Sequence, residues 1–263
     1  MTRRFITFVA ALLLAAPSVS VHAASACRAT SGAMTRPLVE LYTSEGCDSC
    51  PPADRWLASN FGASVADPRA VALAFHVDYW DRLGWVDRFA SAAYTDRQYA
   101  AMRANGESFV YTPQVLLQGH ALVNWRNGAG AVVDAATRGP AGATLALEAA
   151  VDGSTVRVRA DAQVADARAR ADAQLLVAYA DSGLVSDVKA GENRGVRLAH
   201  DNVVRALRVV GAPDRLGHAQ ASFSMSRPAE AGTHPMLVAF VQRSSTGDIL
   251  QTLALPLAGC ASP

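Results

Sequence analysis

Residues 41–57, LYTSEGCDSCPPADRWL, place two cysteines two residues apart between an apolar run and a double proline. Residues 38–43 have the apolar character of a short strand. After the prolines, apolar residues recur at the three- and four-residue spacing of one helix face: Ala53, Trp56, Leu57 and Phe61. Prolines cost little in the first turn of a helix, because the amides there have no intrahelical partner. The cysteine pair is therefore predicted at a turn from strand to helix.

Two cysteines at such a turn suit a redox centre, half of a metal site, or a structural staple. A thiol at a helix N-terminus faces unpaired amides and the positive end of the helix dipole, which lower its pKa. Cys47 is then predicted to be the exposed nucleophile, and Cys50 the resolving thiol that attacks a mixed disulfide. A structural disulfide across so short a gap is strained and rare. A redox pair is therefore favoured, with a metal site and an inert pair as alternatives.

Strands and helices alternate through the rest of the first half. Residues 70–77, AVALAFHV, are almost continuously apolar and are predicted to form a buried strand. Further on, we expect a helix within 91–105, a strand, turn and strand over 109–125, and a helix over about 128–138 that ends at Gly139-Pro140. The order β-α-β-α-β-β-α, with C-x-x-C opening the first helix, is the layout of a thioredoxin fold. Residues 27–140 are thus predicted to form an α/β thioredoxin-like domain.

From residue 143 the pattern changes to alternating apolar and polar residues. The run TLALEAAVDGSTVRVRADAQ, residues 144–163, predicts a hairpin about Asp152-Gly153. Further runs such as QLLVAYA, VRALRVVG, PMLVAFVQR and ILQTLALPL have strand character. Residues 141–263 are therefore predicted to form an antiparallel, β-rich, sandwich-like domain.

Thr112 and Pro113 support the redox interpretation. In thioredoxin-like proteins the matching Thr-Pro or Val-Pro bond is cis and abuts the cysteine pair. By that resemblance, these two residues are expected to shape a substrate groove; the alternative is an ordinary trans proline at a strand edge. Glu40 lies inside the first apolar strand, where burial would raise its pKa, and it is expected to take the proton from Cys50. The alternative for Glu40 is a structural role.

Residues 76–81, HVDYWD, leave the carboxyl end of the second predicted strand, the edge at which α/β folds gather their sites. Tyr79 and Trp80 are expected to wall the groove beside Cys47, and Asp78 to polarise it. His76 together with the two cysteines suggests copper or zinc binding, as in thioredoxin-like copper chaperones. A satisfied core histidine is the more common situation, so the metal site is kept as the alternative.

The first 26 residues resemble a secretory signal peptide, with two arginines, an apolar run too short to span a bilayer, and small residues near Ala23 to Ala26. Cleavage there places the chain in the periplasm or outside the cell, where disulfides persist. With Cys47 and Cys50 paired, Cys27 is predicted to form a structural disulfide with Cys260. Lipidation of Cys27 is the alternative.

Composition excludes several other classes of function. The formal net charge is +1, and no basic stripe indicates nucleic-acid binding. No second apolar segment indicates a membrane span in the mature chain. No Ser-His-Asp order, phosphate-binding glycine loop or four-ligand zinc spacing occurs, so no cofactor is predicted.

Four motifs carry a resemblance to a known family: VELYTSEGCDSCPPAD, LAFHVDYWDRLGW, YTPQ and AGENRGVRLAHDNVVRAL. The chain resembles the domain of unknown function 1223 family of secreted, bacterial, thioredoxin-like proteins. The resemblance implies a thioredoxin-like domain with an appended β-rich region, and no established substrate or reaction. The last motif has five polar residues: Glu192, Asn193, Arg194, His200 and Asn202. These residues could contact the redox face or a partner. The favoured alternative is that they form a hydrogen-bonded loop that holds the β-rich region against the first region.

The function expected from these observations is that of a secreted or periplasmic thiol-disulfide oxidoreductase. Glu45 and Asp48 flank Cys47 and disfavour its thiolate, which favours a reductase or isomerase over a strong oxidase. Its partners would be protein thiols and disulfides, or a redox partner in the cell envelope. The alternative is a non-enzymatic module that binds copper, zinc or an envelope partner.

Overall fold

The computed structural model describes residues 27–63, 69–127 and 129–260; the signal peptide predicted at 1–26 lies outside them. The first part of the chain forms β1 (Cys27–Thr30), β2 (Leu38–Thr43), α1 (Pro51–Phe61), β3 (Val71–His76), the 3-10 helix η1 (Asp81–Leu83), α2 (Ala92–Ala104), β4 (Gln114–Leu117), β5 (His120–Ala121) and α3 (Ala129–Ala136). The rest forms β6 (Thr144–Asp152), β7 (Thr155–Gln163), α4 (Ala167–Arg170), β8 (Ala173–Asp181), β9 (Leu184–Asp187), β10 (Arg197–His200), β11 (Val203–Gly211), β12 (His218–Ser226), β13 (Met236–Arg243) and β14 (Ile249–Pro256).

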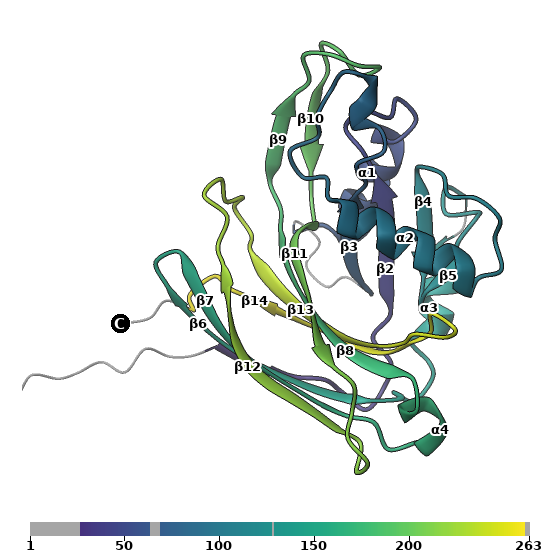
Figure 1. Ribbon diagram of the computed structural model, residues 1–263, viewed down its shortest axis with the longest axis vertical. Helices are drawn as coiled ribbons and strands as arrows, with labels where there is room; N and C mark the ends of the chain where they lie inside the picture. Colours follow the sequence, from purple (N-terminus) through teal and green to yellow (C-terminus); the bar gives the residue numbers. More distant parts are fainter. Residues whose placement is uncertain (1–26, 64–68, 128, 261–263) are drawn as a thin grey trace, which may run out of the picture.

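The strands form two large sheets and one ribbon (Figure 1). The larger sheet has eight strands in the order β14-β13-β8-β11-β3-β2-β4-β5, and the smaller has four in the order β1-β6-β7-β12. Strands β9 and β10 form the ribbon, which stands beside α1 at the upper end of the view. None of the helices in the described ranges is both long and apolar enough to cross a membrane.

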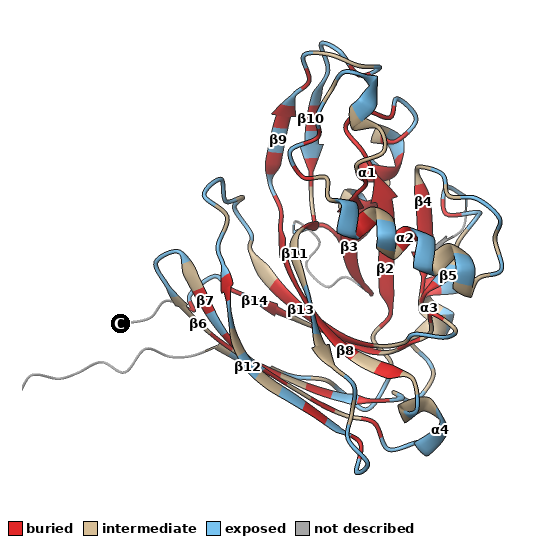
Figure 2. Ribbon diagram, in the orientation of Figure 1, coloured by how far each residue is buried: buried red, intermediate tan, exposed pale blue. Residues whose placement is uncertain are grey.

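Helices α1 and α2 cover opposite faces of the parallel pair β2–β3. Because successive residues of a strand face opposite sides, Val39 and Leu41 share a core cluster with Leu57 of α1. Tyr42 lies in a different cluster, with Tyr94 of α2. Both strands are buried along their full lengths, as Figure 2 shows. Since β2 and β3 are parallel, the segments that follow them leave the sheet at the same edge, and the cysteine turn lies there.

A second core lies between the four-stranded sheet and strands β8, β13 and β14 of the larger one. Leu147 and Val158 come from the smaller sheet, and Tyr179, Leu237 and Leu253 come from the larger. The predicted hairpin about Asp152-Gly153 is present as β6 and β7. Strand β8 is buried on both faces, because this core covers one side and the α2 side covers the other.

The predicted fold class, an α/β thioredoxin-like domain followed by an antiparallel sandwich-like domain, is wrong. The chain is mostly β, and its central sheet is a mixed one that includes strands from both halves of the sequence. Strand β11 joins β3 in parallel, with Val203 opposite Ala74, and also pairs with β8 in antiparallel fashion. The physical reason is that β3 would otherwise leave a row of unpaired amides and carbonyls at the sheet edge, which β11 covers.

Cys27 and Cys260 form a disulfide, so this predicted pairing is confirmed. The bridge links residues 233 positions apart in the sequence. In the loop-entropy model a closed loop of that size stabilises the folded chain by about 5 kcal/mol. The bridge therefore ties the start of β1 to the segment that follows β14.

Candidate functional site

Cys47 and Cys50 form a disulfide at the turn between β2 and α1, with their Cα atoms 5.4 Å apart. Cys50 is the N-cap residue of α1, and its carbonyl oxygen accepts hydrogen bonds from the amides of Ala53 at 2.8 Å and Asp54 at 3.2 Å. Pro51 begins the helix, at a position where the missing amide costs nothing. The predicted position of the pair, at a strand-to-helix turn, is confirmed.

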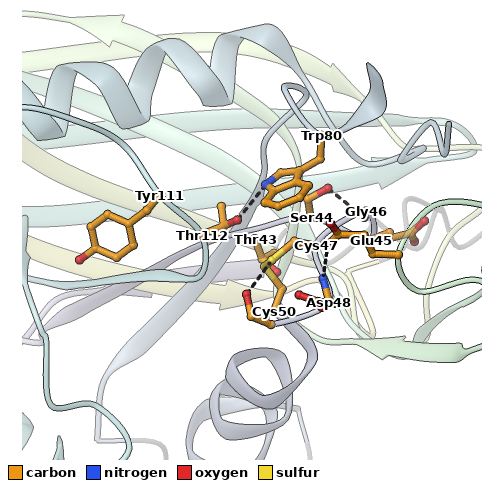
Figure 3. Close-up of a disulfide and its surroundings, with 12 residues drawn as sticks. Thr43, Ser44, Glu45, Gly46, Cys47, Asp48, Cys50, Trp80, Tyr111 and Thr112 are labelled. Carbon is orange, nitrogen blue, oxygen red and sulfur yellow. Dashed lines mark hydrogen bonds between the residues drawn. A yellow bond between two sulfur atoms is a disulfide. The ribbon is translucent and has the colours of Figure 1, made fainter. Parts of the chain in front are cut away.

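The disulfide is closed off from solvent. Cys47 and Cys50 are both 0% exposed, so the expectation that Cys47 is an exposed nucleophile is wrong for this form of the protein. Ser49 Oγ lies 3.3 Å from Cys47 Sγ. Trp80 packs against the same turn, since a Cβ placed on Gly46 would lie only 3.1 Å from Trp80 Cβ (Figure 3). The cover therefore includes a side chain from the segment after β3.

Trp80 and the predicted groove residues are brought together. Trp80 Nε1 donates a hydrogen bond to Thr112 Oγ1 at 2.8 Å, and both side chains lie beside the disulfide in Figure 3. The peptide bond between Thr112 and Pro113 is cis, as predicted. The segments after β3 and before β4 thus meet over the cysteine turn.

Asp78 and Tyr79 are bound to α2. Asp78 Oδ1 accepts a hydrogen bond from Thr95 Oγ1 at 2.6 Å, which occupies the carboxylate that was expected to polarise the groove. The Tyr79 hydroxyl donates a hydrogen bond to Gln98 Oε1 at 3.2 Å, and burial raises the pKa of Tyr79. Both contacts anchor the segment that carries Trp80 to helix α2.

Glu40 lies on the α2 face of β2, opposite the face that α1 covers. Its Oε2 accepts hydrogen bonds from Arg97 Nε at 2.9 Å and from the Tyr42 hydroxyl at 3.1 Å. Burial acts to lower the pKa of Arg97, but the charges and hydrogen bonds of Glu40 and Tyr42 together raise it, and burial raises the pKa of Tyr42. Proton transfer from Cys50 to Glu40 stays a prediction, and these contacts favour the structural role.

Five buried ionisable side chains, which we call the buried cluster, come from both halves of the chain: Glu45, Asp54, His76, Asp87 and His200. Asp54 is one helical turn beyond Cys50, and its Oδ1 accepts a hydrogen bond from Thr43 Oγ1 at 2.9 Å. Burial raises the pKa of Asp54, although His200 and His76 act to lower it.

His76 and Asp87 form a buried ion pair, with 2.7 Å between His76 Nδ1 and Asp87 Oδ2. The amide of Glu45 donates a hydrogen bond to the same carboxylate oxygen at 2.9 Å. Burial alone would lower the pKa of His76, but the charge and hydrogen bond of Asp87, with the charges of Asp54 and Glu45, together raise it above its ordinary value. Burial alone would raise the pKa of Asp87, but the charge and hydrogen bond of His76, with the backbone amides of Glu45 and Phe89, together lower it. The pair therefore favours its charged form.

Glu45 connects this pair to the ribbon. Glu45 Oε2 accepts a hydrogen bond from Trp85 Nε1 at 2.7 Å. Glu45 Oε1 lies 3.3 Å from His200 Nε2 at the end of β10, close enough for an ion pair but outside hydrogen-bond geometry. Burial acts to raise the pKa of Glu45, but His200, Ser186 and Trp85 together lower it. The two histidine rings are 5.1 Å apart between centroids.

The loop at the tip of the β9–β10 ribbon contacts the cysteine turn directly. Asn193 Nδ2 donates hydrogen bonds to the backbone oxygens of Glu45 and Cys47, each at 2.9 Å. Glu192 Oε2 accepts a hydrogen bond from the amide of Asp48 at 3.2 Å. Of the two roles considered for this motif, contact with the cysteine face is therefore present. The same residues also join the two halves of the chain.

Sequence reasoning missed Asp54 and Asp87 as site residues. The spacing of Asp54 from Cys50, four residues along a predicted helix, was a usable signal because such residues share a helix face. Asp87 lies in an irregular segment and has no local signal. The sequence draws attention to His200 and Glu45 separately. Their contact is not predictable, because it depends on the ribbon folding back onto the cysteine turn.

The metal-binding alternative gains no support from the geometry. Both sulfur atoms of the pair are in a disulfide, and His76 Nδ1 is taken by Asp87. Across the described ranges, no three or more His, Cys, Asp or Glu side chains are grouped so that they could hold a metal ion.

Comparison with protein families gives one match, to the model described as "Protein of unknown function (DUF1223)", over residues 38–242. The chain belongs to the DUF1223 family. The match includes the cysteine turn, the segment with Trp80, the Thr112–Pro113 segment and the β9–β10 ribbon. A search of curated proteins gives no match.

Two solved structures are similar to this DUF1223 chain over most of its length. Protein AGR_C_4864 from Agrobacterium tumefaciens is 28% identical, with a TM-score of 0.57, and the match covers 86% of this chain and 96% of that one. HBP35 of Porphyromonas gingivalis is 13% identical, with a TM-score of 0.59, over 85% of this chain and 76% of that one. The second likeness concerns the fold alone.

Proposed function

We propose that this DUF1223 protein is a thiol-disulfide oxidoreductase in which Cys47 attacks and Cys50 resolves. The observation that carries the proposal is the Cys47–Cys50 disulfide at the N-terminus of α1. The helix dipole at such a position stabilises a thiolate, which is the reactive form of cysteine. The chain already has a long-range staple in Cys27–Cys260, and a bridge across two residues closes too short a loop to add much stability.

Exchange with a substrate requires the cysteine turn to open, because Cys47 is buried in the disulfide form. Trp80 and Asn193 hold the turn by packing and by hydrogen bonds, and neither belongs to a regular helix or strand. Nearby, the loop before Thr112 carries two side chains that face solvent, Phe109 at 66% exposed and Tyr111 at 38%. Exposed aromatic side chains beside a reactive pair suit a polypeptide substrate.

Electrostatics favour a reductase or an isomerase over a strong oxidase. Glu45 and Asp48 flank Cys47 in sequence, and Glu192 accepts the hydrogen bond of the Asp48 amide. That amide is one of the groups that would otherwise stabilise a thiolate at the start of the helix. Neighbouring carboxylates raise a thiol pKa, and a less stable thiolate makes the pair less oxidising.

The proposal includes secretion to the periplasm or beyond, because the sequence of residues 1–26 resembles a signal peptide. A reductase in an oxidising compartment needs a donor of electrons. Its partners are therefore protein thiols and disulfides, or a redox protein of the cell envelope.

Turnover of insulin disulfides by the purified chain, with dithiothreitol as electron donor, tests the proposal. The expected result is precipitation of insulin B chain faster than in dithiothreitol alone, and loss of that acceleration in Cys47→Ser. The matched control is the double variant Cys27→Ser/Cys260→Ser, assayed where it is folded, which keeps the activity. Equal rates for the wild type and Cys47→Ser, with insulin and also with scrambled ribonuclease, would contradict the proposal.

A further inference from the structure

The buried cluster is a costly arrangement that the fold does not require. Removing a charge from water costs several kcal/mol unless the charge is paired and hydrogen-bonded. Yet within the described residues His76 Nε2, both ring nitrogens of His200 and Glu45 Oε1 have no hydrogen-bond partner. Buried polar atoms left in this state need an explanation, and functional sites are where such groups gather.

Two members of the cluster, Asp54 and Glu45, are close to the cysteines in the sequence. Asp54 follows the N-cap residue Cys50 by four residues, so the two lie about one helical turn apart on the same side of α1. Glu45 precedes Cys47 by two residues, and its backbone oxygen and that of Cys47 are held by the same Asn193 amide group. No other ionisable side chain in the described first turn of α1 is buried.

We infer that the buried cluster is the proton store of the disulfide, with Asp54 taking the proton of Cys50 and with His76 and His200 balancing the charge. This inference rests on the proposed function and names the residues that move its protons. It assigns to Asp54 the task that the sequence had suggested for Glu40, whose carboxylate is held by Arg97 on the other face of β2.

Reduction of a substrate disulfide by the two cysteines takes two steps. The Cys47 thiolate, having lost its proton to solvent, attacks a substrate disulfide; the mixed disulfide forms and the first substrate sulfur leaves as a thiolate. Cys50 then gives its proton to the Asp54 carboxylate, and its sulfur attacks Cys47 Sγ. The mixed disulfide breaks and the second substrate sulfur leaves. The protein loses two electrons and two protons, and the substrate gains two of each once its thiolates are protonated from solvent and from Asp54.

The hydrogen bonding, burial and neighbouring charges of the Asp54 carboxylate suit it to accept the proton of Cys50. Thr43 of β2 donates a hydrogen bond to its carboxylate, and the charges of His200 and His76 act to lower its pKa while that of Asp87 acts to raise it. Burial raises its pKa above the ordinary value of an aspartate, and a general base works best when its pKa lies near the working pH.

Trapping of the mixed disulfide tests the inference. Reduced wild type, Asp54→Asn and the control Asp96→Asn, an exposed carboxylate on α2, are mixed with a disulfide-bonded peptide and quenched with acid at intervals. Mass spectrometry then measures the Cys47 mixed disulfide. Positioned general bases contribute about 100-fold or more to such steps. We expect the mixed disulfide to persist at least tenfold longer in Asp54→Asn at pH 7, and the difference to shrink as pH rises, because a thiol then ionises more readily without a base. The control matches the wild type.

A second variant covers the case in which Asp54→Asn does not fold. His200→Gln keeps the carboxylate but removes a side chain that acts to lower the pKa of Asp54, and we expect it to shift the pH midpoint of the resolution step. An unchanged lifetime and pH profile in a folded Asp54→Asn, or an unchanged midpoint in His200→Gln, would overturn the inference. If the wild type itself forms no mixed disulfide, the proposed function fails instead, so the two failures are distinguishable.

Discussion

Replacing Asn193 by alanine should loosen the cysteine turn and make its disulfide easier to reduce. The side chain donates two hydrogen bonds, each 2.9 Å long, to the backbone oxygens of Glu45 and Cys47. Each bond contributes about 1 kcal/mol, and the loss is larger for the Glu45 oxygen than for the Cys47 oxygen, which keeps a hydrogen bond from the Cys50 amide. Asn193→Ala should therefore cost about 2–3 kcal/mol of unfolding free energy. If opening of the turn limits access, a loss of about 2 kcal/mol in the closed state raises the reduction rate by about 30-fold.

Asn105 offers a matched control, because its amide also donates to two backbone oxygens, those of Ala101 at 2.9 Å and Gly119 at 2.8 Å. It lies at the end of α2, and Asn105→Ala should lose a similar unfolding free energy in urea titration. The assay is reduction by dithiothreitol, quenched with iodoacetamide and followed by mass spectrometry of the peptide with Cys47 and Cys50. Faster reduction is expected in Asn193→Ala alone. Equal rates in the wild type and both variants would refute the reasoning.

Three further outcomes are expected. Glu40→Gln breaks the buried ion pair with Arg97 and should cost about 3–5 kcal/mol of unfolding free energy in urea titration. The rate of insulin reduction per folded molecule should stay at the wild-type value; a lower rate in folded Glu40→Gln would show that Glu40 takes part in the reaction. Cys27→Ser/Cys260→Ser should lose about 5 kcal/mol of unfolding free energy, and an unchanged value would show that the bridge does not restrict the unfolded chain. The raised pKa of His76 makes its ion pair stabilising at pH values below the unfolded pKa of about 6.5, and this contribution is lost as pH rises through the higher folded pKa. The lowered pKa of Asp87 makes the pair stabilising above about 3.8, and this contribution is lost as pH falls through the lower folded pKa. The pair's contribution is thus greatest between about pH 4 and pH 6.5, so the unfolding free energy lost between pH 5.5 and pH 8.5 should be smaller in Asp87→Asn than in the wild type; equal losses would contradict the assignment.

Features that depend on local sequence were predictable. The turn from strand to helix at Cys47 and Cys50 follows from an apolar run, two prolines and a helical spacing of apolar residues, all within residues 38–61. The bridge between Cys27 and Cys260 followed from counting cysteines, since only one pairing leaves the close pair together. In each case neighbouring residues decide the outcome.

Features that depend on meetings between distant segments were not predictable. Nothing in the apolar run of β3 says that its free edge pairs with β11, because many strands have the same apolar pattern. Likewise, Cys47 is buried by contacts from Trp80 and Asn193, which lie in irregular segments far along the chain. The buried cluster combines side chains from the turn after β2, from α1, from β3, from the segment after η1 and from β10, so no single stretch of sequence contains its pattern.

Equilibration of the protein in dithiothreitol redox buffers tests the central claim most directly, with each thiol state measured by alkylation and mass spectrometry. If Cys47 and Cys50 form a reversible redox centre, they should change between disulfide and dithiol in one two-electron transition, while Cys27–Cys260 stays oxidised and circular dichroism stays native. The opposite result is reduction of the pair only together with Cys27–Cys260, as the protein unfolds. That result would make the pair a structural bridge.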